Sequence, residues 1–219
     1  MAKSNRFYFA CYRDNCGSQV AFHCQNGGGY STDLAKAHAY NLESAQKEFE
    51  FCREFEELLC ADRVDAVSEW HVDCQQIPSA STAAETGELY AGYKAGQWDG
   101  NDVFWLSNNG LPTTNFELAS FTHNPDFHNP KIVWIPALMA AKAARRVIKA
   151  DAINRRKMIT SAGLRIPEAV KRRKDQARRK ASERHRWNCP GCGRLVWQRN
   201  PYSFDGCTHP HCSEWRPNY

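Results

Sequence analysis

The sequence contains none of the short motifs that mark the most common enzyme classes. It has no His-Glu-x-x-His pair, no Gly-x-x-x-x-Gly-Lys-Ser phosphate loop and no Gly-x-Ser-x-Gly elbow. No apolar stretch approaches the roughly 18 residues that a membrane span requires, and the apolar run at 7–12 is too short for a signal peptide. We therefore expect a cytoplasmic protein without membrane contact, and a function other than catalysis.

Acidic and basic residues are unevenly distributed along the 219 residues. Residues 1–130 hold 8 Lys and Arg against 18 Asp and Glu, a balance of −10, whereas residues 131–219 hold 21 against 6, a balance of +15. The hydrophobic content of 42% is sufficient for one core of moderate size. The composition predicts an acidic body at 1–136 followed by a basic arm, and such an arm most often meets a polyanion.

Four cysteines near the C-terminus have the spacing of a metal site. Cys189-Pro190-Gly191-Cys192 is followed, after a spacer of hairpin length, by Cys207 and Cys212. Two tight thiolate turns can supply four tetrahedral ligands to Zn²⁺, and flanks this short and polar cannot form a core without a metal. The arrangement resembles a zinc ribbon of the Cys-Pro-x-Cys-Gly type, which we place at 187–219.

The other possible metal ligands leave two alternatives open. Four residues separate Cys207 from Cys212, where two are usual, so His209 or His211 can substitute for one thiolate. The remaining cysteines lie among apolar neighbours, as buried thiols do: Cys11, Cys16, Cys24, Cys52, Cys60 and Cys74. The alternative is a second zinc site with ligands from these cysteines and two histidines: Cys11, Cys16, His23, Cys24, His71 and Cys74.

The acidic body has the pattern of an α+β fold. Strands are predicted at 6–12 and 19–24, and the Asp-Asn-Cys-Gly turn between them indicates a hairpin. Thr32 or Asp33 can cap a short helix that ends at Ala39. Asn41 can cap a longer helix at 42–61, in which apolar residues recur at helical spacing and face the core.

Two segments of the body resemble each other. Residues 21–37 align without gaps with residues 103–119, 82 positions further on, and Phe, Asn, Gly, Thr and Ala coincide. The likeness predicts an internal repeat, a unit of strand, glycine loop and capped helix that occurs twice. The alternative is a chance likeness between two similar turns.

The first of these segments contains Gly29-Tyr30-Ser31-Thr32-Asp33-Leu34, followed by Ala37 and Tyr40. This run resembles the GYxxDLxxAxxY motif of small, mostly uncharacterised proteins that phages and mobile elements encode. The resemblance covers about 35 residues and implies a phage or mobile-element origin, but no activity. The chain departs from the family at Cys24 and Gln25, where a basic residue or proline is frequent.

A doubled His-Asn-Pro places two imidazoles and a carboxylate close together, at His123, Asp126 and His128. Such a group can bind a metal ion for nuclease-like hydrolysis, although that chemistry requires further ligands. The two Asn-Pro steps are also strong turn formers. We therefore expect an exposed loop here, with a metal site as the alternative.

The basic arm, 137–186, follows a predicted buried strand at 131–135. Its first helix, 137–161, has an apolar side that can dock on the body. A second helix has Pro167 in its first turn, where a missing N–H is tolerated, and runs through Arg186. Between Lys171 and Arg186 nine cations face two acids, so this helix repels itself unless it meets negative charge.

These features favour a non-enzymatic nucleic-acid-binding accessory protein that contacts the phosphate backbone of DNA or RNA. The contacts are expected from basic residues of the second helix and the ribbon: Lys171, Arg172, Arg173, Lys174, Arg178, Arg179, Lys180, Arg184, Arg186, Arg194 and Arg199. The acidic body is then available for a protein partner. A second interpretation is an inhibitor or adaptor of a host machine such as a polymerase, ribosome or defence complex, and a third is a metal-dependent nuclease.

Overall fold

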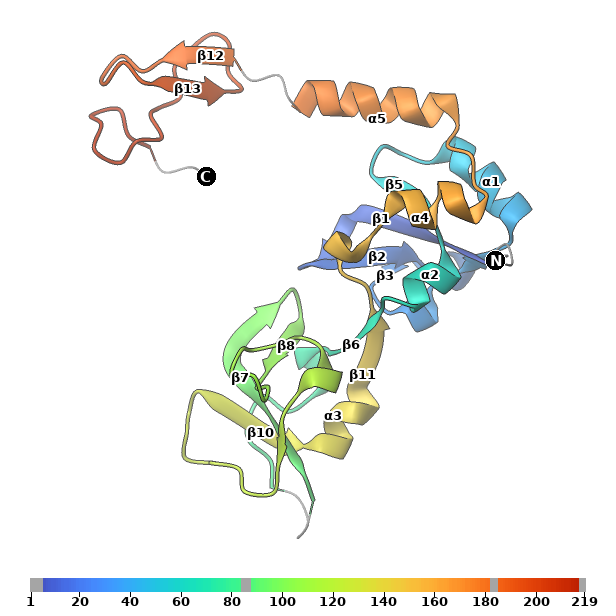
Figure 1. Ribbon diagram of the computed structural model, residues 1–219. Coiled ribbons are helices and arrows are strands. Elements are labelled where there is room, and N and C mark those ends of the chain that lie inside the picture. The colour runs from blue at the N-terminus through green and yellow to red at the C-terminus, as the bar shows by residue number, and fades with distance from the viewer. Residues whose placement is uncertain (1–5, 84–87, 182–184, 217–219) are drawn as a thin grey trace. The chain divides into compact units, whose positions relative to one another are not determined.

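The computed structural model describes residues 6–83, 88–181 and 185–216. These residues form a mixed α/β structure with several small sheets and few helices (Figure 1). The chain divides into two compact units, unit 1 at Met1–Val170 and unit 2 at Lys171–Tyr219. The boundary predicted after Pro136 falls inside unit 1.

The first sheet of unit 1 is built around β1, which pairs with three other strands. Its members, all paired antiparallel, are β1 (Phe7–Cys16), β2 (Gln19–His23), β3 (Tyr30–Ser31), β4 (Ala39–Tyr40) and β5 (Glu56–Cys60). The hairpin of β1 and β2 is present as predicted, and Gly17 in its turn has φ +60°, a conformation that favours glycine. Asn41 caps α1 (Leu42–Phe51), as predicted, by accepting a hydrogen bond from Ser44 N at 2.8 Å.

The second sheet has the same pattern of pairing around β7. Its members, also antiparallel, are β7 (Tyr90–Asp99), β8 (Asp102–Trp105), β9 (Phe121–Thr122) and β10 (Ile132–Pro136). β7 pairs with β8, β9 and β10, as β1 pairs with β2, β4 and β5. Each sheet continues from its last strand directly into a short helix: α2 (Ala61–Asp65) after β5 and α3 (Ala137–Ala143) after β10.

A third, two-stranded sheet connects the two halves of unit 1. β6 (Glu69–Val72) follows α2, β11 (Ala144–Val147) follows α3, and the two strands lie side by side and antiparallel (Figure 1). Beyond β6, Cys74 N donates to Asn101 O at 2.8 Å in the second hairpin. Beyond β11, Ala150 N donates to Ser18 O at 2.9 Å in the first hairpin. The last segment of each half is therefore hydrogen-bonded to the hairpin of the other half.

Each of the two larger sheets has its own hydrophobic core. The first core contains Phe7, Phe22 and Phe49, and it is completed from 153–170 by side chains that include Met158 of α4 (Arg155–Met158). The second core is centred on Trp105, which is fully buried. Residues 153–170 thus belong with the first sheet, although they follow the second one in the chain.

The predicted helix at 42–61 is wrong beyond Phe51. α1 ends there, and the chain re-enters the first sheet as β5, all five residues of which are buried. A strand buried on both faces has no alternation of polar and apolar residues. Its sequence therefore continued the helical pattern of α1, and the pairing with β1 decides its conformation.

The predicted helix at 137–161 is also wrong beyond Ala143. The chain becomes extended at Ala144 and forms β11, a 3-10 helix at Ala150–Ala152 and then α4. Alanine and arginine favour helix, but pairing with β6 and burial of Val147 override this weak preference.

Two shorter predictions are corrected in length. The helix expected up to Ala39 is one 3-10 turn, Leu34–Lys36, capped by Asp33, one of the two residues predicted as its cap. α5 (Glu168–Ala181) begins directly after Pro167, which was expected within its first turn, and ends before Arg186, which belongs to β12. Further 3-10 turns lie at Gln25–Gly27, Cys74–Gln76, Phe116–Leu118 and Thr160–Ala162.

Candidate metal centre

The turn of a two-stranded hairpin in unit 2 carries the first two cysteines of the cluster. The hairpin consists of β12 (His185–Asn188) and β13 (Leu195–Gln198). Cys189 N donates to Arg194 O, and Gly193 N donates to Cys189 O, both at 2.8 Å. Gly193 closes this turn with φ +71°, a backbone conformation that residues other than glycine rarely adopt.

The second pair of cysteines is held by the loop after β13. Cys207 N donates to Glu214 O at 2.7 Å, and Arg216 N donates to Cys207 O at 3.0 Å, so the chain runs back past Cys207. Cys212 N donates to His209 O at 3.1 Å. The wider gap between these two cysteines is therefore taken up by a turn at 209–212.

The four sulfur atoms form a cluster of the size that one metal ion requires. All four Sγ atoms lie within 4.8 Å of one another. The Sγ atoms of Cys189 and Cys212 are 3.5 Å apart, and those of Cys192 and Cys207 are 3.7 Å apart. Sulfurs about 2.3 Å from a tetrahedral ion are separated by about 3.8 Å. These cysteines can therefore hold a metal ion, as the zinc-ribbon spacing predicted.

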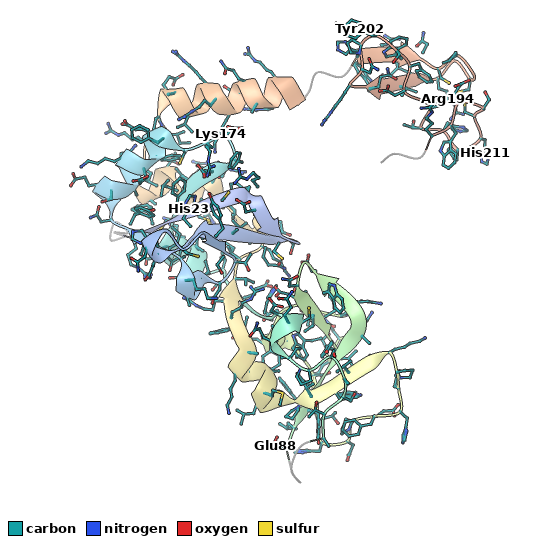
Figure 2. All side chains as sticks on the ribbon, turned by 180° about the vertical axis from the view of Figure 1, so that it is seen from behind. His23, Glu88, Lys174, Arg194, Tyr202 and His211 are labelled. Atoms are coloured by element: carbon teal, nitrogen blue, oxygen red, sulfur yellow. The ribbon has the colours of Figure 1, made fainter. Side chains whose placement is uncertain are left out.

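Neither of the two nearby histidines belongs to this cluster. The ring centroids of His209 and His211 are 5.7 Å apart, and Figure 2 shows His211 and Tyr202 at opposite ends of the ribbon. His209 contributes through its backbone, because its N–H donates to Cys207 Sγ at 3.4 Å. Within the described residues, four thiolates are the geometrically consistent ligand set.

The thiols influence one another's protonation. Desolvation raises the pKa of Cys189, but the backbone N–H groups of Cys192 and Gly191 and the Cys212 thiol lower it to about 7. The backbone N–H of Glu214 lowers the pKa of Cys212, whereas desolvation and the other sulfurs raise it to about 12. The Cys189 thiol therefore loses its proton readily, and its negative charge disfavours deprotonation of the neighbouring thiols. A divalent cation relieves this repulsion and favours all four thiolates.

The loop with the doubled His-Asn-Pro does not bring its ligands together. Over 6–83, 88–181 and 185–216, the cysteine cluster is the only group of three or more ligands close enough for an ion. Asp126 Oδ1 accepts from His128 N at 3.0 Å, and Asp126 O accepts from Trp134 Nε1 at 3.0 Å. His123 lines an apolar hollow with Phe121. Asp126 thus stabilises the turn expected of Asn-Pro steps.

The two histidines of the possible second zinc site, His23 and His71, are held by packing and by carboxylates. The His23 ring stacks on Phe9 with centroids 4.0 Å apart, and its Nε2 lies 3.3 Å from Glu56 Oε1. The buried His71 ring places Nδ1 2.8 Å from Asp102 Oδ2 and Nε2 3.1 Å from Glu69 Oε2. None of the six cysteines of this unit forms a disulfide, and three are fully buried: Cys11, Cys52 and Cys60.

Sequence reasoning missed the polar cluster around His71. Asp102 is fully buried, and its Oδ1 also accepts a hydrogen bond from Arg145 Nη2 at 2.5 Å. Arg145 lies on β11 opposite His71 on β6. The cluster forms only because β6 of the first half pairs with β11 of the second half. No local sequence pattern therefore predicts it.

The basic residues predicted to contact phosphate are divided between α5 and the ribbon. Arg186, Arg194 and Arg199 are exposed on or beside the hairpin of β12 and β13. Arg178 pairs with Asp175 on α5. Arg184 lies outside the described residues, and only the backbone of Lys180 is described. The other predicted members all lie on α5: Lys171, Arg172, Arg173, Lys174 and Arg179.

Three aromatic side chains of unit 2 lie on the surface. Trp197 is 56% exposed, Tyr202 is 92% exposed and Trp215 is 46% exposed. Trp187 and Phe204 do pack together, with ring centroids 6.3 Å apart. Strict alternation of exposed and buried residues along β13 is the signal that distinguishes the outward-facing Trp197.

No protein-family model, curated protein or solved structure matches this chain. The resemblance of residues 29–40 to phage and mobile-element proteins therefore stays a prediction. The motif has a folding role here, because Asp33 caps a turn and Leu34 and Ala37 are buried. Among the described residues, no helix is both long and apolar enough to cross a membrane.

Proposed function

We propose that unit 2 binds Zn²⁺ through Cys189, Cys192, Cys207 and Cys212 and attaches the chain to the phosphate backbone of nucleic acid. Four thiolates in a tetrahedral arrangement are a donor set typical of structural zinc. A closed site of this kind leaves no open coordination position for a substrate. The zinc ion therefore orders the unit, and binding depends on the side chains that surround it.

The charge of unit 2 carries the proposal of nucleic-acid binding. Residues 171–219 contain 12 Lys and Arg against 4 Asp and Glu, a balance of +8, whereas residues 1–170 contain 17 against 20, a balance of −3. Arg186, Arg194 and Arg199 are exposed. Cations on one small unit attract a polyanion by releasing its counterions, and this attraction is independent of sequence.

An electrophoretic mobility shift series at several salt concentrations tests this proposal. Replacing four arginines of α5 with glutamine should weaken binding to all sequences alike: Arg172, Arg173, Arg178 and Arg179. On duplex DNA the slope of log affinity against log salt should fall by about 0.9 for each phosphate that is no longer neutralised. Glutamine keeps the helix propensity of α5, so the weaker binding reports charge.

The matched control replaces four exposed lysines of unit 1 with glutamine: Lys36, Lys131, Lys142 and Lys157. It has the same change in charge and should leave the salt slope unaltered. Equal effects of the two variants would contradict the assignment to unit 2. If the protein does not bind nucleic acid at any salt concentration, the result would favour the competing function, in which unit 2 binds a host protein complex.

We further propose that unit 1 is an internal duplication, with one copy in 6–76 and the other in 89–152. The strand pairings support it, because Ala10 pairs with Phe22 and Tyr93 pairs with Trp105. Both members of the second pair lie 83 residues after those of the first, 10 to 93 and 22 to 105. The hairpin ends follow the same shift: Cys16 with Gln19 and Asp99 with Asp102.

Later elements correspond with smaller shifts. Asp33 and Asn115, 82 residues apart, each cap a 3-10 helix through the side chain. β5 and β10 lie 76 residues apart, 56 to 132, because a loop at 123–130 stands where the first copy has α1. The ungapped alignment of 21–37 with 103–119 therefore matches the caps but is one residue out of register in the strands.

A further inference from the structure

The outer face of the ribbon hairpin carries an exposed aromatic ring beside a cation. Trp197 on β13 lies directly opposite Arg186 on β12. Side chains alternate between the two faces of a strand. Because Val196 and Gln198 are buried, Trp197 points away from the cysteine cluster. Its ring is 56% exposed, so it contributes little to the core of unit 2.

The charged residues of the hairpin itself, 185–200, have a single sign. Residues 185–200 contain Arg186, Arg194 and Arg199 but no aspartate or glutamate. All three arginines are exposed. A surface of this charge complements a phosphate backbone. An exposed indole beside a guanidinium is also the combination on which unpaired bases stack. In a duplex, by contrast, neighbouring base pairs cover the faces of the bases.

A second ring is presented to solvent by a hydrogen-bonded loop. Gln198 is buried, and its Nε2 donates to Asn200 O while its Oε1 accepts from Asp205 N, both at 2.8 Å. Asn200 Oδ1 accepts from Tyr202 N at 2.9 Å. Tyr202 itself is 92% exposed, and Figure 2 shows it at one end of the ribbon. The loop therefore holds Tyr202 where it can contact a ligand and where it adds nothing to packing.

We propose that the outer face of the hairpin, with Arg186 and Trp197, and the exposed Tyr202 of the following loop bind unpaired nucleotides of single-stranded DNA or RNA. One base stacks on the Trp197 indole while an adjacent phosphate lies at Arg186, and Tyr202 supplies a second stacking surface. The inference rests on the proposed attachment of unit 2 to nucleic acid and specifies its substrate class, single strands in preference to duplexes.

Fluorescence anisotropy of the full chain, with three labelled probes of equal length, tests this preference. The probes are an oligothymidylate, an oligouridylate and a DNA duplex of mixed sequence. Trp197→Leu should weaken binding of the single-stranded probes by about 5- to 100-fold. It should change the duplex affinity by less than about 2-fold, because phosphate contacts are unaffected.

Three further variants separate stacking from charge and from apolar area. Trp197→Phe keeps an aromatic face and should restore most of the single-strand affinity. Leu195→Ala removes an exposed apolar side chain from the same face, and it should leave binding unchanged. Arg186→Gln should lower the salt slope on single strands by about 0.7, whereas Trp197→Leu should not alter it.

Each variant must keep the circular dichroism spectrum and metal content of the wild-type chain. Should Trp197→Leu disturb the fold, Tyr202→Ser replaces it, because a ring that is 92% exposed can be removed without loss of packing. If the substitution of Trp197 or Tyr202 has no effect on binding of the single-stranded probes, or weakens binding of single-stranded and duplex probes equally, the inference is overturned. Nucleic-acid binding by unit 2 then stays in place. Failure of the wild-type chain to bind any probe overturns both.

Discussion

Buried charged residues of unit 1 are matched to partners of opposite charge. Glu56 is 2% exposed, and it accepts hydrogen bonds from the backbone N and the Nε of Arg53, both at 2.9 Å. Asp102 is likewise enclosed between His71 and Arg145. A buried charge without a partner is far more costly than a paired one. These pairs therefore favour one particular arrangement of the strands that carry them.

The Glu56 carboxylate should make the stability of unit 1 depend on pH. Desolvation raises the pKa of Glu56, but its hydrogen bonds to Arg53 and the nearby positive charge lower it overall, below the ordinary value of 4.5. The stabilisation is thus complete above about pH 4.5 and is lost as the pH falls through the folded-state pKa. Glu56→Gln should cost about 1–3 kcal/mol at pH 7 and much less at pH 3.

Urea unfolding of the two proteins at both pH values measures this difference. Glu43→Gln is the control, because Glu43 also has a lowered pKa, beside Lys47, but lies in an exposed pair. Its substitution should change stability little at either pH. A cost of Glu56→Gln that is the same at pH 7 and pH 3 would show that the charge plays no part.

At the scale of elements, the proposed duplication places different side chains at one surface of the two halves of unit 1. In the first half, Arg6 Nη2 lies 2.9 Å from both Asp62 Oδ1 and Asp65 Oδ2. Ala61 N donates to Arg6 O at 2.9 Å, and the matching bond in the second half joins Ala137 N to Leu89 O at 2.8 Å. By this correspondence Leu89 replaces Arg6, and Leu138 replaces Asp62. These two leucines line one apolar hollow of about 520 Å³.

Transplanting the ion pair tests the proposed duplication. Leu89→Arg and Leu138→Asp together should be more stable than the sum of the single changes, by about 0.2–1 kcal/mol, the usual coupling of an exposed pair. Thermal unfolding in a double-mutant cycle measures the coupling. It should weaken at high salt. Both leucines are substantially exposed, so neither substitution opens the core.

The matched control combines Leu89→Arg with Leu118→Asp. Leu118 is as exposed as Leu138, at 61%, but does not line the same hollow. Its charge should therefore show no coupling to Arg at position 89. If the pair at 89 and 138 also shows none, the two halves do not correspond at this surface, and the duplication loses this support.

At the scale of the whole molecule, the two units owe their stability to different sources. Unit 1 has two hydrophobic cores joined by the exchange of β6 and β11. Within the described residues, the core of unit 2 consists of Cys189, Val196 and Cys207, with Phe204 and Cys212 packed against it. A core of this size cannot order a unit without a metal or another cross-link.

Removal of metal should therefore unfold the ribbon and leave unit 1 intact. Hydrogen exchange measured by mass spectrometry should show loss of amide protection over 185–216 after chelation and no change over 7–170. Cys192→Ser should have the same effect without chelator. Cys24→Ser is the matched control, because Cys24 is a half-buried free thiol of unit 1.

Metal analysis of protein purified without chelator should give about one zinc per chain, as a single four-cysteine site requires. Absence of zinc from that protein, or unchanged amide protection of the ribbon after chelation, would contradict the metal centre. Unfolding of unit 1 on chelation would instead show that the stability of the two units is coupled.

Features that depend on a few neighbouring residues could be predicted from the sequence. The spacing of the four cysteines indicated the metal cluster, because each pair is closed by a local turn. Asp33 and Asn41 cap the turns that they were predicted to cap, and Gly17 marks the first hairpin. In each case the deciding hydrogen bonds or dihedral angles lie within a few residues along the chain.

Features that depend on distant partners were decided only by the tertiary structure. β5 and β11 have sequences that suit helices, yet each becomes a strand because a strand far along the chain offers its backbone hydrogen bonds. The contact of His71 with Asp102, and the exposure of Trp197, likewise follow from which faces of the strands are covered. The sequence by itself determined the local turns, caps and metal ligands. Long-range pairing determined the strands and the surfaces, because burial is a property of the assembled sheets.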